Sequence, residues 1–266
     1  AGAAESPKDV RESVTQASAA ASRAAILLNK GRFAVEAITA VVDANLCKQC
    51  GICAGICPFG AIQWEKKQPA RVTSAACAGC GTCAAECKYG AIVMRHFSYQ
   101  AIYAQIDAIL EQDPAEKIVA FACNWCSYAG ADTAGVSRLA YPPNARIIRT
   151  MCSGRVNPEF IWHSFKQGAP VVLVSGCHYV DCHYMDANRN TTRRLDGLWD
   201  GLEKARLRPG RLLLEWCSAA EGARWQTIMT EAEKRRQSVS LEEIAQTQAL
   251  LVEAKPPSPR TVRPGD

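Results

Sequence analysis

The residues best suited to chemistry in this 266-residue chain are its 14 cysteines. Eight of them form two groups that repeat one spacing, C-x2-C-x2-C-x3-C: Cys47, Cys50, Cys53 and Cys57, and then Cys77, Cys80, Cys83 and Cys87. In this spacing three close thiolates wrap one face of a four-iron cubane, and the fourth reaches the cluster of the other copy. The repeat therefore predicts two [4Fe-4S] clusters.

This crossed arrangement assigns four ligands to each cluster. The first cluster is expected to take Cys47, Cys50, Cys53 and Cys87, and the second is expected to take Cys77, Cys80, Cys83 and Cys57. Gly51 and Gly81 relieve crowding where each loop turns tightly. Short strands are expected to begin at Ala61 and Ala91. A pair of structural zinc sites is the alternative, but zinc ribbons use two separated C-x2-C pairs.

The repeat resembles the bacterial two-cluster ferredoxins over about residues 43 to 95. The resemblance implies an α+β, ferredoxin-like module. One position departs from the pattern, because Pro58 follows the fourth cysteine of the first copy but Lys88 follows that of the second. Proline does not bind iron, so the expected ligands are unchanged, although a cation beside one cluster could raise its potential.

Downstream, the pattern changes to alternating strands and helices. A helix is expected over residues 97–112, and four short apolar runs indicate buried strands at residues 117–122, 145–150, 170–175 and 211–216. Such an order favours a small α/β domain with a mainly parallel sheet.

The other six cysteines lie where these strands end. Cys123, Cys152, Cys177 and Cys217 each follow a strand, while Cys126 and Cys182 add a second thiol to two of the loops. The carboxyl ends of parallel strands form a binding crevice, so these thiols could converge. Convergent soft thiolates suit iron–sulfur chemistry.

Residues 117–230 resemble the delta subunit of methyl-viologen-reducing hydrogenase, in segments such as F-A-C-N-W-C-S-Y, S-G-C-H-Y-V-D-C-H-Y and L-E-W-C-S-A-A-E-G. The resemblance implies one [2Fe-2S] cluster and a link between a hydrogenase or formate dehydrogenase and heterodisulfide reductase. It maps the cluster onto four of five cysteines: Cys123, Cys126, Cys152, Cys177 and Cys182. Cys217 lies outside this set and is interpreted as a buried apolar thiol.

Other interpretations exist for the second group of cysteines. The C-x-x-C of Cys123 and Cys126 is also typical of thiol–disulfide exchange. His178 and His183 each follow a cysteine, which invites a zinc or Rieske-type site, but the Rieske spacing differs. Both histidines are therefore expected near the ligands or on the surface. Three tryptophans are expected to pack in the core or the crevice: Trp125, Trp162 and Trp216.

A helix is expected near each end of the chain, and the first one is interpreted as a docking helix. Residues 10–30 form an alanine-rich helix, and the stretch resembles the last helix of the flavin domain in the heterodisulfide reductase A subunit. No G-x-G-x-x-G follows a strand, so flavin is expected in a partner chain. Residues 241–253 form another helix before a Pro-rich tail. The expected division is 1–42 docking helix, 43–96 ferredoxin domain, 97–116 linker helix, 117–236 delta-subunit-like domain, and 237–266 helix and tail.

The composition narrows the class of protein. The net charge of +5 is spread along the chain without a dense basic block, which argues against nucleic-acid binding. No apolar stretch approaches the roughly 20 residues of a membrane span, so a cytoplasmic protein is expected.

The hypothesis is an electron-transfer subunit, without a catalytic residue of its own, that serves heterodisulfide-reductase-like subunits and a hydrogenase, formate dehydrogenase or similar enzyme. The competing hypothesis is a redox-sensing or zinc-binding regulatory protein with a stand-alone ferredoxin module.

Overall fold

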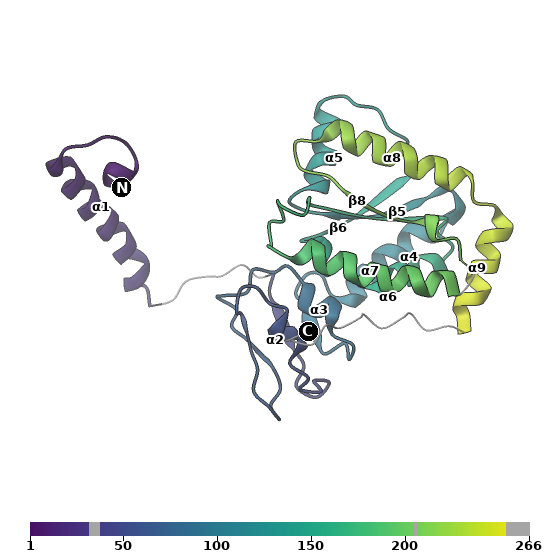
Figure 1. Ribbon diagram of the computed structural model, residues 1–266, viewed down its shortest axis with the longest axis horizontal. Coiled ribbons are helices and arrows are strands. Elements are labelled where there is room, and N and C mark those ends of the chain that lie inside the picture. Colours follow the sequence, from purple (N-terminus) through teal and green to yellow (C-terminus); the bar gives the residue numbers. More distant parts are fainter. Residues whose placement is uncertain (32–37, 205–206, 254–266) are drawn as a thin grey trace. The chain divides into compact units, whose positions relative to one another are not determined.

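The computed structural model describes residues 1–31, 38–204 and 207–253, and the chain divides into two compact units, Ala1–Ala37 and Ile38–Asp266. The first unit contains a short 3-10 helix, η1 (Gly2–Ala4), and the helix α1 (Val10–Asn29; Figure 1). The Asp9 carboxylate caps α1 by accepting from the backbone N–H of Glu12 at 2.7 Å. No residue of α1 is buried, so this helix has no core of its own. The Pro-rich tail lies outside the described residues.

The cysteine-repeat module, residues 38–96, is built from short elements. Its helices are α2 (Ile52–Gly55) and α3 (Thr82–Glu86). Its strands form two antiparallel pairs, β1 (Ala40–Val42) with β4 (Ile92–Met94) and β2 (Ile62–Gln63) with β3 (Arg71–Val72). Each helix begins directly after a glycine in the left-handed region, Gly51 or Gly81. The two copies of the repeat therefore fold alike, with a cysteine loop, a glycine turn, a helix and a strand.

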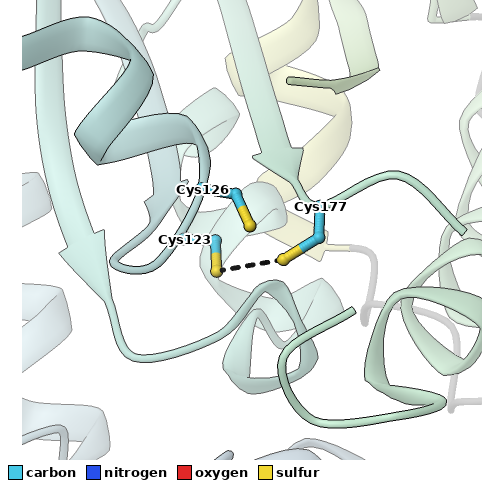
Figure 2. A group of neighbouring side chains, drawn as sticks. All are labelled: Cys123, Cys126 and Cys177. Atoms are coloured by element: carbon cyan, nitrogen blue, oxygen red, sulfur yellow. Dashed lines mark hydrogen bonds between the residues drawn. The ribbon is translucent and has the colours of Figure 1, made fainter. Parts of the chain in front are cut away.

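A four-stranded parallel sheet is the centre of the sheet domain, residues 97–253. Its strands are β5 (Ile118–Cys123), β6 (Ala145–Thr150), β7 (Val171–Gly176) and β8 (Leu212–Trp216), in the spatial order β6-β5-β7-β8. Every residue of β5 and β7 is buried, as expected for central parallel strands covered on both faces. The predicted parallel sheet is confirmed. β5 ends at Cys123, and Cys177 directly follows β7 (Figure 2).

Helices cover both faces of the sheet (Figure 1). α5 (Ser127–Val136) and α8 (Gly222–Gln237) lie on one face, and α4 (Tyr99–Leu110), α6 (Pro158–Lys166) and α7 (Ala187–Lys204) lie on the other. Short 3-10 turns are η2 (Pro114–Glu116), η3 (Ser153–Arg155) and η4 (Pro209–Arg211). Ser98 caps α4 by accepting from Ala101 N–H at 3.2 Å, so this helix starts two residues later than the sequence predicts. Within the described ranges, no helix has the length and apolar character needed to cross a bilayer.

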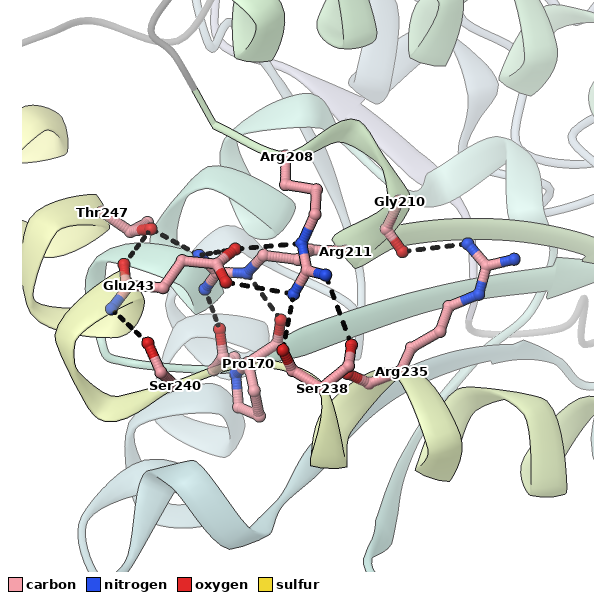
Figure 3. A network of polar contacts seen from close by, with 10 residues as sticks. Pro170, Arg208, Gly210, Arg211, Arg235, Ser238, Ser240, Glu243 and Thr247 are labelled. Carbon is pink, nitrogen blue, oxygen red and sulfur yellow. Dashed lines mark hydrogen bonds and ion pairs between the residues drawn. The ribbon is translucent and has the colours of Figure 1, made fainter.

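The last helix, α9 (Leu241–Glu253), is fastened to the start of β8 by the buried side chain of Arg211 (Figure 3). The guanidinium donates to the carbonyl oxygens of Ala169 and Pro170 at 2.9 and 2.7 Å, and to the Thr247 hydroxyl on α9. Burial lowers the pKa of Arg211 to about 10. One side chain therefore connects β8, the approach to β7 and α9.

Candidate metal centres

Two cavities inside the cysteine-repeat module are each lined by four cysteines. One has Cys47, Cys50, Cys53 and Cys87, and the other has Cys57, Cys77, Cys80 and Cys83. In each cavity three cysteines come from one copy of the repeat and the fourth comes from the other copy. The helices α2 and α3 pack against each other, which carries each fourth cysteine across. The structure thus brings together the same two sets of thiols that the crossed arrangement predicts.

Burial and mutual repulsion make these thiols hard to ionise in the absence of a cation. The pKa of Cys53 is raised to about 11, first by burial and then by the neighbouring Cys50, Cys87 and Cys47. Complete burial raises the pKa of Cys83 well above its ordinary value. Because the thiolate is the form that binds metal, iron in each cavity would offset both effects. Two sets of four soft donors fit iron–sulfur clusters.

A buried hydroxyl beside one cavity supports this fit. Thr82 Oγ1 is buried and has no nitrogen or oxygen partner among the described residues. Its hydroxyl and backbone N–H instead act on the Cys80 sulfur, where they lower a pKa that burial raises. A hydroxyl that has only sulfur within reach is suited to a site filled by thiolates and sulfides, because sulfur atoms of such clusters accept hydrogen bonds.

The sheet domain carries a further group of thiols at the carboxyl ends of its strands. The sulfur atoms of Cys123, Cys126 and Cys177 all lie within 4.8 Å of one another, and those of Cys123 and Cys177 are 3.9 Å apart (Figure 2). The chain leaves β5 for β6 on one side, and then returns past β5 to β7 and β8 on the other. The carboxyl ends of β5 and β7 thus meet where the strand order reverses, which is where open α/β sheets bind their ligands.

Cys152 and Cys182 complete this thiol group. Cys182 packs against the three central cysteines and also against Cys152, which is almost fully buried. Hydrogen bonds from Cys126, Cys152 and Cys177 hold the pKa of Cys123 far below its ordinary value. The five cysteines of the predicted [2Fe-2S] site are therefore one continuous group.

Cys217 is separate from the thiol group. It is fully buried in the apolar core between β8 and α8, and burial, with Glu221 nearby, raises its pKa to about 11.

Among the described residues, His178 and His183 do not join a metal-binding group. His178 Nε2 lies 2.6 Å from a carboxylate oxygen of Glu221, and His183 stacks on Trp125 with the ring centres 4.2 Å apart.

The three tryptophans take different places. Trp162 is buried in the core, and Trp216 packs edge-on against Tyr179 at 5.3 Å between ring centres. Trp125 is 43% exposed, beside the thiol group, and its indole N–H donates to the Tyr184 hydroxyl at 2.8 Å. It therefore lines the rim of the site and is not part of the core.

Tyr184 connects the two parts of the molecule that hold cysteines. It is almost fully buried and packs with Cys152, with the partly buried Phe59 and Cys80 lying against the same cluster. The Phe59 and Tyr184 rings meet edge-on at 6.3 Å. Sequence reasoning missed this residue, although C-H-Y occurs twice in C-H-Y-V-D-C-H-Y. The thiol group is thus adjacent to the cavity that contains Cys80.

Buried arginines also join the module to the sheet domain. Arg194 of α7 pairs with Glu86 of α3 at 2.7 Å, and both side chains are buried. Arg155, at the end of η3, is 1% exposed. Neither arginine could be distinguished in sequence from the many on the surface, because no local pattern marks a charge that is buried by a distant part of the chain.

The chain matches two family models. Residues 118–239 match the methyl-viologen-reducing hydrogenase delta subunit, and residues 46–92 match a 4Fe-4S dicluster domain. The second match agrees with the ferredoxin-like fold of the cysteine-repeat module.

Individual relatives match one or both parts. Two CoB-CoM heterodisulfide reductase A subunits, from Methanosarcina acetivorans and Methanosarcina mazei, are each 45% identical over 240 residues, which is 90% of this chain. The chain spans only 30% of the length of those relatives. An iron-sulfur subunit of the F420-non-reducing hydrogenase of Methanococcus voltae is 51% identical over 115 residues, covering 43% of this chain and 80% of that relative. The chain therefore belongs to the family of the methyl-viologen-reducing hydrogenase delta subunit, with a 4Fe-4S dicluster domain ahead of the region that defines this family.

Proposed function

We propose that this chain relays electrons between partner subunits of an oxidoreductase complex, through two [4Fe-4S] clusters and one [2Fe-2S] cluster. The proposal rests on the arrangement of the cysteines, because all of them except Cys217 lie in three groups. Tyr184 packs between the thiol group of the sheet domain and the cavity that contains Cys80, so two of the three groups are neighbours. Clusters of this kind supply one-electron redox chemistry. The protein would hold them in partly buried sites, two of which lie next to each other.

The proposed ligands of the cubane clusters follow the two cavities. Cys47, Cys50, Cys53 and Cys87 would hold one, and Cys57, Cys77, Cys80 and Cys83 would hold the other. The proposed ferredoxin domain is residues 43–96, linked through residues 97–116, which include α4, to the delta-subunit-like domain, residues 117–236.

For the [2Fe-2S] cluster we assign Cys123, Cys126, Cys177 and Cys182. The first three have sulfur atoms within 4.8 Å of one another, and Cys182 packs directly against them. Cys152 is then the spare thiol, and it packs with Tyr184 on the side facing the cysteine-repeat module. In this position a thiol can donate a hydrogen bond to the cluster without binding iron, which is one way in which proteins tune such centres.

The proposed partners follow from the named relatives. One is called an A subunit of heterodisulfide reductase, and another is called an iron-sulfur subunit of a hydrogenase. We therefore propose heterodisulfide-reductase-like subunits on one side and a hydrogenase, formate dehydrogenase or similar enzyme on the other. Flavin would reside in a partner chain, and the complex would be cytoplasmic. No substrate site is assigned to this chain.

Iron and sulfide quantitation with electron paramagnetic resonance tests the proposal on the anaerobically purified chain. We expect about ten iron atoms per chain, because two cubanes contain eight and a [2Fe-2S] cluster contains two. A zinc-binding or redox-sensing regulator would contain no iron, and a stand-alone ferredoxin with an inert thiol domain would contain about eight.

Two cysteine variants sharpen the test. Cys123→Ser should remove only the [2Fe-2S] signal, because Cys123 is central to the thiol group. Cys217→Ser is the matched control and should keep all three signals, because Cys217 lies in the apolar core. Loss of the same signal in both variants would contradict the assignment of the site.

A further inference from the structure

Arg155 is a buried cation with no carboxylate partner among the described residues. It is 1% exposed, and its Nε donates a hydrogen bond to the carbonyl oxygen of Phe97 at 3.0 Å. Both terminal nitrogens, Nη1 and Nη2, are buried without a hydrogen-bond partner in the described parts of the chain. The guanidinium lies over the rings of Tyr99 and Phe160, 4.6 and 4.8 Å from their centres. Arg194, the other buried arginine at this boundary, has Glu86 as its counter-charge.

The side chain of Arg155 lies directly over a loop of the second cysteine cavity. A Cβ atom built on Gly81 would come within 2.7 Å of Arg155 Cδ and 2.9 Å of its Cβ. Gly81 stands between Cys80 and Cys83, two of the cysteines that line this cavity. A thiolate at Cys83 interacts favourably with the guanidinium, and burial is the main influence that works against its positive charge.

An uncompensated charge in such a place is costly. Removing a guanidinium from water carries a penalty of several kcal/mol unless an opposite charge offsets it. The aromatic rings offset part of this penalty. Among the cysteines of this cavity, the Cys83 thiolate is the negative charge that acts on the guanidinium.

We propose that Arg155 raises the reduction potential of the cubane cluster held in the cavity of Cys57, Cys77, Cys80 and Cys83. This inference rests on the proposed function. When one electron enters this site, from an added reductant or from the neighbouring centre, the charge of the site becomes more negative by one unit. No bond forms or breaks in the protein, and Arg155 keeps its proton. A fixed cation stabilises the reduced state more than the oxidised state, so this centre becomes the more easily reduced of the two cubanes.

The contrast with Lys88 makes the inference specific. Lys88 follows Cys87 of the other cavity and is exposed, so water screens its charge. The buried Arg155 is screened far less. Lys48, which lines the other cavity, is exposed as well, so Arg155 is the buried cation in this comparison and its charge should act more strongly on a cluster.

The test is a redox titration of the full chain, followed by electron paramagnetic resonance. A Cys80→Ser variant first identifies the signal of the cluster in question. Arg155→Gln should then lower the equilibrium constant for reducing that cluster at least tenfold, which is about 59 mV for one electron. The other cubane and the [2Fe-2S] cluster should not change. Arg155→Lys should shift the potential less than Arg155→Gln does. The matched control is Arg149→Gln, because Arg149 is an exposed arginine that also lies over an aromatic ring, that of Tyr128.

The outcomes separate the inference from the function on which it rests. If Arg155→Gln retains its iron and the potential does not move, Arg155 is only a packing residue and the inference is wrong. If the Arg155 variants lose iron or do not fold, the potentials of the wild-type chain provide the test. Of its two cubane signals, the one that Cys80→Ser alters must have the higher reduction potential. A lower reduction potential for that signal overturns the inference. A wild-type chain without iron would remove the proposed function itself.

Discussion

Replacing Arg194 by methionine should destabilise the whole of the second unit. Arg194 and Glu86 are 108 positions apart in sequence, yet their side chains pair at 2.7 Å and are 1% and 5% exposed. Arg194 also donates to the carbonyl oxygen of Gly154 at 2.9 Å. Methionine fills a similar volume but leaves the Glu86 carboxylate buried without a cation. Removing one partner of a buried pair costs about 3–5 kcal/mol, or roughly a hundredfold to several thousandfold in the unfolding equilibrium.

Urea unfolding of the cluster-loaded chain measures this loss, with circular dichroism and visible absorbance followed in parallel. The double variant with Glu86→Gln should be more stable than the single variant, because no unpaired carboxylate remains buried. Arg224 is the matched control. Its ion pair with Glu215 spans 3.3 Å between side chains that are 43% and 39% exposed, so Arg224→Met should cost no more than about 1 kcal/mol. A loss below about 1 kcal/mol for Arg194→Met would refute the reasoning, as would a double variant with the summed losses of the two single variants.

Other replacements test the thiol assignment, the glycine turn and the docking of the last helix. Cys182→Ser should abolish the [2Fe-2S] resonance whereas Cys152→Ser should keep it, and the reverse pattern would exchange their roles. Gly81→Ala should lower the stability by roughly 1–2 kcal/mol or more and reduce the iron content, because φ is +82° and the new methyl group would meet Arg155; wild-type iron content and urea midpoint would contradict this. Arg211→Met should cost about 2–4 kcal/mol, since several carbonyl and hydroxyl groups lose a charged donor, and should speed amide exchange in residues 241–253; unchanged exchange there would show that α9 docks without it.

The sequence was most informative where its signals are local. Every predicted strand of the sheet lies within one residue of its observed bounds, because continuous apolar runs bounded by turns leave few alternatives. The carboxyl-end position of Cys123 and Cys177 then followed from parallel topology alone. The spacing of the repeat likewise anticipated which cysteines share a cavity, because it reflects how the chain wraps around a cubane.

Contacts between segments that are distant in the sequence could not be predicted from such local signals. The burial of Arg155 and Arg194 depends on how the cysteine-repeat module packs against η3 and α7, which periodicity in either segment does not reveal. The same is true of Tyr184, whose neighbours come from both modules. Trp125 was expected to pack in the core or the crevice, and its position at the rim follows from the turn between β5 and α5, whose direction the sequence does not specify.

The order of strands in the sheet also bears on how the protein matures. Each cubane cavity draws its cysteines from residues 47–87, a short and continuous stretch of the chain. The central sulfur atoms of the other centre come from the ends of β5 and β7, and they meet only after β6 has been added and the chain has crossed back over β5. Before that crossover only Cys123 and Cys126 are close together, so the full thiol group exists only once β7 lies beside β5.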